Sequence, residues 1–240
     1  MLVLNSQHGS TRGSGRGSRG HAGRRLMAPE LGGENVKTKL GPVPLLYPIP
    51  IVLVGADVDG KPGFCTVGDV AIMGIRPALV CASLSRDHHT TGGIAASGVF
   101  SINLPTAEML SLVDACGMVS GRDCAKAGLF TIGRGDVLGV PLIIECPVNL
   151  ECEVIHEFAV EHRRMFIARV AEAYIDEARL RFPDGDQTVP QARYPLLNSL
   201  DPIIYSLDNS YYRIGERIGR AYEAGREIAA ALVAGPTGSR

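Results

Sequence analysis

The sequence has no tryptophan, and aromatic residues make up only 5% of it. It also lacks an apolar run approaching the roughly 18–20 residues that a membrane-spanning helix needs. Its formal net charge of −1 leaves no basic excess, whereas a general nucleic-acid binder needs a concentrated basic surface. We therefore expect neither a membrane segment nor a nucleic-acid partner. The length of 240 residues suits one large domain or two small ones.

The six cysteines include no Cys-x-x-Cys pair, which argues against a zinc ribbon or a thioredoxin-type dithiol. Several lie inside apolar runs, where a free cysteine behaves as a small hydrophobic residue. We expect mostly reduced thiols, as in a cytoplasmic protein. A catalytic thiol is the alternative, and Cys65 is its first candidate.

Residues 1–36 are rich in Gly, Ser and Arg and hold almost nothing apolar to bury, which predicts a disordered tail. An RGG-like nucleic-acid tail would have interleaved aromatics, which this segment lacks. A transit peptide and a translation start at Met27 are further alternatives, so the sequence leaves open whether residues 1–26 belong to the mature protein. We expect one domain over residues 37–233 and a flexible C-terminus over 234–240.

Short apolar, β-branched runs between turn signals predict strands through most of that domain. Asp59-Gly60 is a strong hairpin signal between two of them. The strands cluster without regular βαβ alternation, which predicts a mainly β protein with flanking helices, built on a closed or nearly closed antiparallel barrel. The long helical insertions argue against a β-sandwich. The expected strands are Ile49–Val58, Gly63–Val70, Ala78–Leu84, Val99–Leu104, Pro141–His156, Met165–Ile175 and Asp201–Leu207; the expected helices are Ala107–Cys116 and Ile214–Val233, with a turn-rich surface at 183–193.

The segment 80–105 organises the chain, because a strand turns polar through Ser85 and Arg86 just before a helix start at Thr90 or Thr91. Free N–H groups and the dipole of a helix N-terminus form an anion site. An arginine fork and hydroxyl groups add hydrogen bonds to the same anion. The segment therefore predicts a phosphate cradle. Alternatively, Thr90 only caps its helix and Arg86 is a solvated turn residue.

Two other groupings suggest chemistry but are better explained structurally. The adjacent residues His88 and His89 would diverge on a strand or a helix, whereas a chelating pair needs both side chains on one face; we expect no metal site. Glu151 and Glu153 share a strand face, and we expect that face to be solvated instead of holding an acid–base pair.

Several longer motifs together resemble the FMN-binding split-barrel proteins of the flavin reductase-like family, in particular flavoredoxins. The resemblance covers about residues 37–226. It rests on Y-P-I-P-I-V-L-V-G-A-D-V-D-G-K-P (47–62), S-L-S-R-D-H-H-T (83–90), F-S-I-N-L-P (100–105), V-S-G-R-D (119–123), L-E-C-E-V-I-H (150–156) and N-S-Y-Y-R-I-G-E-R-I-G-R-A-Y (209–222).

This resemblance implies an antiparallel split barrel, usually a homodimer, with FMN in a groove near the subunit interface. The residues matching those that hold the ribityl phosphate are Ser83, Leu84, Ser85, Arg86 and Thr90. Those matching the isoalloxazine contacts are Gly63, Phe64, Cys65 and Thr66, with Asn103 and Leu104 at its border and Ser120 on a lip of the pocket. His162 falls where relatives often place a histidine near the flavin or nicotinamide; otherwise it is a loop residue.

The implied function is an oxidoreductase in which NADH or NADPH gives hydride to FMN, which passes electrons onward. No G-x-G-x-x-G follows a strand, so the nicotinamide would not occupy a Rossmann domain. The chain has Gly63 and Asp69 where many relatives have an asparagine and an aromatic residue. That difference keeps two alternatives open: a flavin-binding electron carrier served by a protein partner, without NAD(P)H turnover of its own, or a barrel that has lost its flavin.

Overall fold

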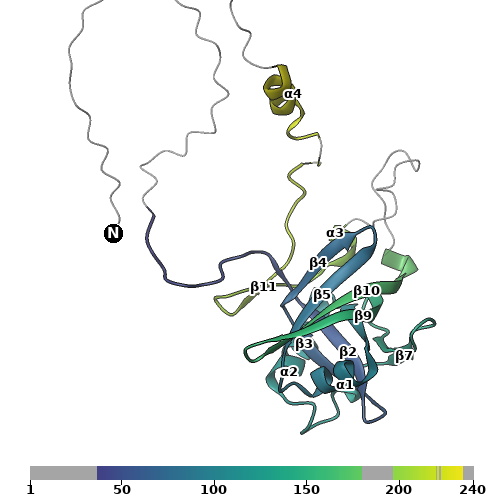
Figure 1. The fold of residues 1–240 in the computed structure, drawn as a ribbon. Coiled ribbons are helices and arrows are strands. Elements are labelled where there is room, and N and C mark those ends of the chain that lie inside the picture. Colours follow the sequence, from purple (N-terminus) through teal and green to yellow (C-terminus); the bar gives the residue numbers. More distant parts are fainter. Residues whose placement is uncertain (1–36, 180–196, 220, 222, 235–240) are drawn as a thin grey trace, which may run out of the picture. The chain divides into compact units, whose positions relative to one another are not determined.

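An antiparallel sheet of seven strands forms the body of the molecule (Figure 1). The computed structural model describes residues 37–179, 197–219, 221 and 223–234, and the compact unit spans Leu45–Gly215. The strand order is β3-β2-β6-β9-β10-β5-β4, and β3 also contacts β5, so the sheet curls toward a barrel. The predicted mainly β, antiparallel architecture is confirmed. The strands are β2 (Val52–Val58), β3 (Lys61–Val67), β4 (Val70–Ile75), β5 (Ala78–Ser85), β6 (Val99–Leu104), β9 (Val148–Val160) and β10 (Arg163–Ile175).

The hairpin of β2 and β3 follows its sequence signal closely. Asp59 and Gly60 both adopt positive φ, 51° and 73°, as a two-residue type I′ turn requires. The second arm is shorter than predicted, because Gly68 and Asp69 separate β3 from a distinct strand β4. This short connection places β3 and β4 at opposite ends of the strand order although they are consecutive in the chain.

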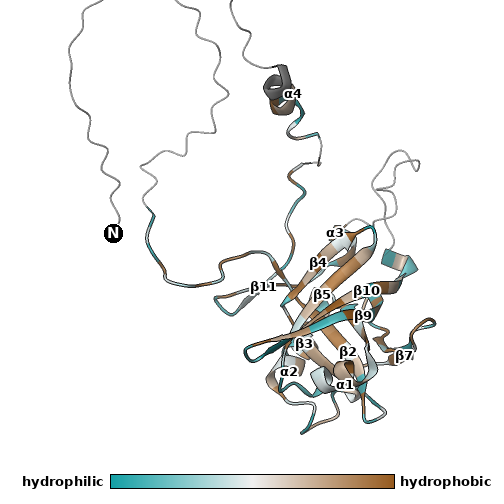
Figure 2. Ribbon diagram, in the orientation of Figure 1, coloured by the Kyte–Doolittle hydropathy of each residue, from teal (hydrophilic) through white to brown (hydrophobic). Residues whose placement is uncertain are grey.

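Strand β2 is buried on both of its faces. Val52, Val54 and Ala56 belong to one core cluster with Phe100 and Phe166. Leu53, and Ile51 just before the strand, belong to a second cluster that includes Phe64 and Val113. Burial on two faces explains why this strand reads as a continuous apolar run in the sequence. Figure 2 shows the central strands as the hydrophobic part of the molecule.

Smaller elements surround this sheet. Strands β1 (Ile49–Pro50), β11 (Ile204–Ser206) and β12 (Ser210–Tyr212) form a three-stranded sheet, and β7 (Ile132–Arg134) pairs with β8 (Pro141–Ile143). The helices of the compact unit are α1 (His89–Ser97), α2 (Leu110–Met118) and α3 (Leu197–Leu200), with 3-10 turns at Ala107–Met109, Lys126–Leu129 and Glu177–Arg179. Among the described residues, no helix combines the length and hydrophobicity that crossing a bilayer demands.

Three sequence predictions are wrong at this level. The predicted strand Pro141–His156 is two strands, β8 and β9, which belong to different sheets. Helix α4 covers Arg226–Ala234, whereas residues 214–219 of the predicted helix have no regular structure; Gly215 and Gly219 interrupt that stretch, and glycine disfavours helix. Glu151 is fully buried, because the loop after β7 covers it and donates the N–H groups of Val137 and Leu138 to its carboxylate. The predictions for residues 1–36, 183–193 and 235–240 lie outside the described residues.

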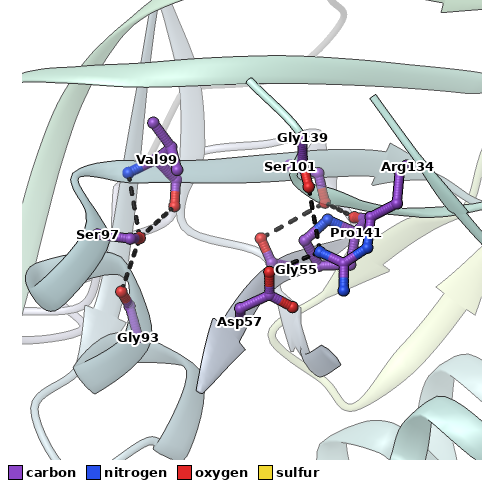
Figure 3. Close-up of polar contacts among 9 residues, drawn as sticks. All are labelled: Gly55, Asp57, Gly93, Ser97, Val99, Ser101, Arg134, Gly139 and Pro141. Carbon is purple, nitrogen blue, oxygen red and sulfur yellow. Dashed lines mark hydrogen bonds and ion pairs between the residues drawn. The ribbon is translucent and has the colours of Figure 1, made fainter. Parts of the chain in front are cut away.

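Buried polar contacts connect β6 to its neighbours (Figure 3). The Ser101 hydroxyl donates to the Pro141 carbonyl at 2.6 Å and accepts from the Asn103 amide at 2.9 Å. Arg134 forms an ion pair with Asp57 at 2.5 Å, beside these contacts. The contacts fix β7 and β8 against β2 and β6.

Candidate functional site

Helix α1 begins at the end of β5 without a side-chain cap. Its N-cap residue, His88, is extended, and no side chain caps the first turn. The helix begins at His89, so the prediction that Thr90 caps it is wrong. The hydroxyl of Thr91 instead donates to the Ser85 carbonyl at 2.7 Å and closes the loop between strand and helix. The first N–H groups of a helix have no intrahelical acceptor, so this end of α1 can bind an anion.

The position of α1 depends on its close approach to β2. A Cβ atom on Gly93 would lie 2.4 Å from the Asp57 carbonyl oxygen, closer than any real Cβ contact. Only glycine therefore allows this packing. Ser97 completes the helix end, because its hydroxyl contacts the carbonyls of Gly93 and Val99 (Figure 3).

A cavity of about 270 Å³ opens beside the start of α1, and we call it cavity A. Strand β3 supplies one wall, the loop and first turn of α1 the second, and the end of α2 with the following loop the third. Figure 1 shows α1 and α2 at the same end of the barrel. The lining residues are Phe64, Cys65, Thr66, Asp87, His88, His89, Thr90, Cys116, Gly117, Met118, Val119, Ser120, Gly121 and Lys126.

Lys126 is the most unusual member of this lining, because it is only 7% exposed. Its ammonium donates to the Cys116 carbonyl at 2.5 Å. Within the described ranges, none of the four ion pairs involves it. A buried charge without a counter-charge is costly. Cavity A therefore has a cation ready for an anionic ligand.

The surroundings of His88 show the same positive bias. Partial burial lowers the pKa of His88, and the nearby charges of Arg163 and Lys126 lower it further, whereas the charge of Asp87 raises it. Arg122 also lowers this pKa, and its guanidinium donates to the Asp87 carbonyl at 2.5 Å. That bond ties the loop after α2 to the loop before α1. The three cations outnumber the one carboxylate, Asp87, among the charges that act on His88, and a net positive field attracts anions.

The cysteines at cavity A are unsuited to nucleophilic catalysis. Burial raises the pKa of Cys65 to about 11, although a hydrogen bond with Thr90 opposes the shift. Burial also raises the pKa of Cys116. Both thiols therefore stay protonated at neutral pH, whereas a nucleophilic cysteine needs its thiolate form. All six cysteines are free, and the described residues contain no group of three potential metal ligands.

Five of the predicted site residues meet at cavity A: Phe64, Cys65, Thr66, Thr90 and Ser120. The Thr66 hydroxyl already donates to the Val113 carbonyl at 2.6 Å. Gly63 lies just behind this group, since a Cβ atom there would be 3.8 Å from the Thr90 hydroxyl oxygen.

The other predicted residues do not line the cavity. Ser83 accepts a hydrogen bond from Arg163 at 3.2 Å, and Leu84 and Leu104 pack in or against the core. The Ser85 carbonyl accepts the hydrogen bond from Thr91 that closes the loop before α1. The exposed Arg86 side chain reaches the Glu161 carbonyl at 3.4 Å, and the neighbouring His162 accepts the Arg86 N–H at 2.9 Å through its own carbonyl.

The side-chain amide of Asn103 also forms its hydrogen bonds within the protein. It is fully buried, and its amide nitrogen donates to the Leu53 carbonyl at 2.9 Å. Its amide oxygen accepts from the Ile143 N–H and the Asn149 side chain. Asn103 therefore joins β2, β6 and β8, and has no group left for a ligand.

Sequence reasoning missed Lys126 and set aside the two histidines. The run Ser120–Lys126 reads as a loop, and the spacing of its charges does not show that it folds back over α2. The only local indication of a cationic site was that this short loop holds two basic residues, Arg122 and Lys126, between apolar segments. In the structure, the donors at one end of cavity A suit a phosphate-like anion, and the Phe64–Thr66 wall suits a flat apolar group.

Comparison with known proteins places this fold and site in context. A family model described as the flavin reductase like domain matches residues 45–196. The crystal structure of flavoredoxin from Methanosarcina acetivorans is 31% identical and superposes with a TM-score of 0.70, covering 82% of this chain and 100% of that one. Flavoredoxin of Desulfovibrio vulgaris (Miyazaki F) is 29% identical, with a TM-score of 0.70, covering 79% and 100%.

Among curated relatives, an NADH-dependent FMN reductase of Streptomyces nodosus subsp. asukaensis is 26% identical over 134 residues, which is 55% of this chain and 72% of that protein. An FMN-binding protein from Thermus thermophilus, 21% identical with a TM-score of 0.62, shares the fold. The resemblance seen in the sequence motifs is confirmed: the chain belongs to the flavin reductase-like family of split-barrel proteins.

Proposed function

We propose that this protein binds FMN in cavity A and acts as a flavin oxidoreductase that takes hydride from NADH or NADPH. The observation that carries the proposal is the buried Lys126 ammonium, which lines the same cavity as the uncapped start of α1 and has no carboxylate partner among the described residues. An anionic flavin nucleotide would supply the missing negative charge. The reductase relative from Streptomyces supports the reaction class.

The residues of the chain have binding and positioning roles in this proposal. The N–H groups of the first α1 turn, the Thr90 hydroxyl and Lys126 would hold the phosphate end. Arg86 lies in the loop before α1 but outside the lining of cavity A, so its positive charge would attract the phosphate only from a distance. The backbone of Gly63–Thr66 would lie along the flavin ring. When bound, FMN supplies the redox chemistry, so the protein needs no acid–base residue of its own.

A flavin-binding electron carrier is the second candidate. Both flavoredoxin structures are more similar to this chain than the reductase relative is, at 31% and 29% identity against 26%. A carrier of this kind would receive electrons from a protein partner and would not turn over NAD(P)H. Gly63 and Asp69, which leave the flavin ring without an amide and an aromatic neighbour, are compatible with that alternative.

Absorption spectroscopy of the purified full-length chain tests both candidates. After incubation with FMN and removal of excess, we expect a flavin spectrum that is bleached by anaerobic NADH or NADPH. A flavin spectrum that persists with both donors would assign the carrier function. Equal affinity for FMN and riboflavin would contradict the phosphate site. Absence of bound flavin would overturn the proposal altogether.

A further inference from the structure

A second and larger cavity, which we call cavity B, adjoins cavity A. Its volume is about 540 Å³, within the range of roughly 300–1,000 Å³ typical of small-molecule sites. The two cavities share Thr66, Gly117 and Met118 in their linings. Cavity B extends from these residues toward the small sheet of β1, β11 and β12. Its other lining residues are Ile49, Ile51, Gly68, Asp69, Asp114, Tyr205, Leu207, Asn209 and Tyr211.

Two tyrosines give cavity B an aromatic wall. Tyr205 on β11 and Tyr211 on β12 face each other across the strand pair, with ring centroids 5.5 Å apart and planes tilted by 55°. Both rings are half-buried and pack against the second core cluster. The Tyr205 hydroxyl donates to the Asn209 side chain at 2.7 Å, which fixes its ring. A wall of fixed aromatic rings favours a planar aromatic ligand.

The charge of cavity B is opposite to that of cavity A. Its lining contains two carboxylates and no lysine, arginine or histidine. Arg163 neutralises Asp69 in an ion pair. Asp114 instead accepts a hydrogen bond from the Tyr211 hydroxyl at 2.7 Å, and no ion pair in the described part of the chain includes it. Asp114 is therefore the uncompensated charge of this cavity.

We infer that cavity B binds a second ligand, a planar aromatic molecule that is uncharged or cationic, while cavity A holds the flavin nucleotide. The occupancy of both cavities at the same time rests on the proposed function, in which cavity A binds FMN. The tyrosine wall would bind the ring through stacking and cation–π attraction. Asp114 would favour a cation and disfavour an anion. The shared residues Thr66, Gly117 and Met118 would bring the two ligands next to each other.

Isothermal titration calorimetry on the full chain, with and without saturating FMN, tests this inference. The ligands are three molecules with one ring system: N-methylquinolinium, quinoline and quinaldate, which at neutral pH are a cation, an uncharged molecule and an anion. We expect the cation to bind most tightly and the anion least. Saturating FMN should leave these affinities unchanged. A separate FMN titration tests cavity A alone.

Asp114→Asn isolates the charge while an amide oxygen can still accept from Tyr211. We expect this variant to lose about five- to tenfold in affinity for N-methylquinolinium, as for a half-buried ion pair, and to bind quinoline unchanged. Asp208→Asn is the matched control, because Asp208 lies in the turn that joins β11 to β12 but does not line cavity B. The control should bind all three ligands as the parent does.

Three outcomes would overturn the inference. Competition between FMN and the quinolines would show that cavity B is part of the flavin site. Quinaldate binding as tightly as the cation, or equal losses in the two variants, would remove the role of Asp114. If the quinolines bind with the expected dependence on Asp114 but FMN does not bind, cavity B stands and the flavin proposal fails.

Discussion

At the scale of single residues, Lys126 decides the proposed flavin site. We expect Lys126→Met to weaken FMN binding by about 1.5–3 kcal/mol, the usual worth of a hydrogen bond to a charged group. The methionine preserves the volume of the buried chain and removes its charge. The measurement is the quenching of FMN fluorescence on titration with protein. Lys61→Met is the control, because Lys61 is exposed on β3 and does not line cavity A.

Arg86 offers a contrast to Lys126. Its side chain is exposed and lies near the Glu161 carbonyl, outside the lining of cavity A. We expect Arg86→Ala to weaken FMN binding by no more than about 1 kcal/mol, as for other solvent-screened charges. The same fluorescence titration measures it. A loss greater than that of Lys126→Met would move the phosphate from cavity A to the outer end of β5.

Glu151 contributes to the stability of the folded protein and to its dependence on pH, and the proposed reaction gives it no role. Burial raises the pKa of Glu151, but hydrogen bonds from the Tyr174 hydroxyl and the Val137 and Leu138 N–H groups outweigh burial and hold the pKa below its usual value of 4.5. The ionised form therefore stabilises the folded protein at neutral pH. This contribution is complete above the unfolded-state pKa and is lost as the pH falls through the lower folded-state pKa.

The prediction for Glu151→Gln follows from those contacts. The glutamine amide places N–H groups against N–H donors, so we expect a loss of about 1–3 kcal/mol in the free energy of unfolding at neutral pH. The difference from the parent should narrow as the pH falls below about 4, where the parent loses its own contribution. Urea unfolding at several pH values measures both effects. Glu153 is an exposed residue on the same strand, so Glu153→Gln should change neither the free energy of unfolding nor its dependence on pH.

At the scale of elements, the sequence predicts best what depends on local chemistry. Asp59-Gly60 specifies its turn because both positions need positive φ, and the apolar runs of β2 and β5 identify buried strands. Helix α1 starts at His89, before the predicted start at Thr90 or Thr91, and the Thr91 hydroxyl bonds back to the Ser85 carbonyl instead of capping the helix. The stretch 214–219 was predicted as helix from its spacing, but its two glycines outweigh that pattern. Local signals thus locate elements better than they fix their ends.

Helix α1 provides a paired test of its packing on β2. We expect Gly93→Ala to destabilise the protein by about 1–3 kcal/mol, because the new methyl group would collide with the Asp57 backbone and move the helix. FMN binding should weaken with it, since α1 carries part of the site. Gly92→Ala is the control: nothing lies within 4 Å of the added atom, and a stability gain of about 0.5–1 kcal/mol is expected for alanine in a helix. Thermal unfolding of both variants measures the difference.

At the scale of the whole molecule, the site combines segments that no local signal connects. Residues 64–66, 90 and 120 were predicted as site residues and do meet at cavity A. Lys126 enters the cavity because its ammonium bonds the end of α2, ten residues back in the chain. Asn103 shows the reverse case, because it matches a family motif but its amide is used inside the barrel. Topology, rather than residue type, decided both cases.

The exposed edge of the main sheet argues for a homodimer, the assembly that the family resemblance implies. Strand β4 ends the strand order, and its Ile72, Met73 and Ile75 side chains are 76%, 54% and 66% exposed. An open edge strand with large apolar side chains invites pairing or coverage by another chain. An irregularity in the pairing of β4 lies between Ile72 and Gly74, and a partner that covered this edge would contact the exposed side chains on both sides of it.

We therefore expect light scattering after gel filtration to give twice the chain mass of 25.5 kDa. The double variant Ile72→Lys, Met73→Lys should elute as a monomer, because burying two lysines without partners is costly. Leu112→Lys is the control, since Leu112 is an exposed apolar residue on α2, away from the sheet edge. A parent protein that is monomeric at micromolar concentration would refute the dimer. A variant that stays dimeric while remaining folded would move the interface to another face of the molecule.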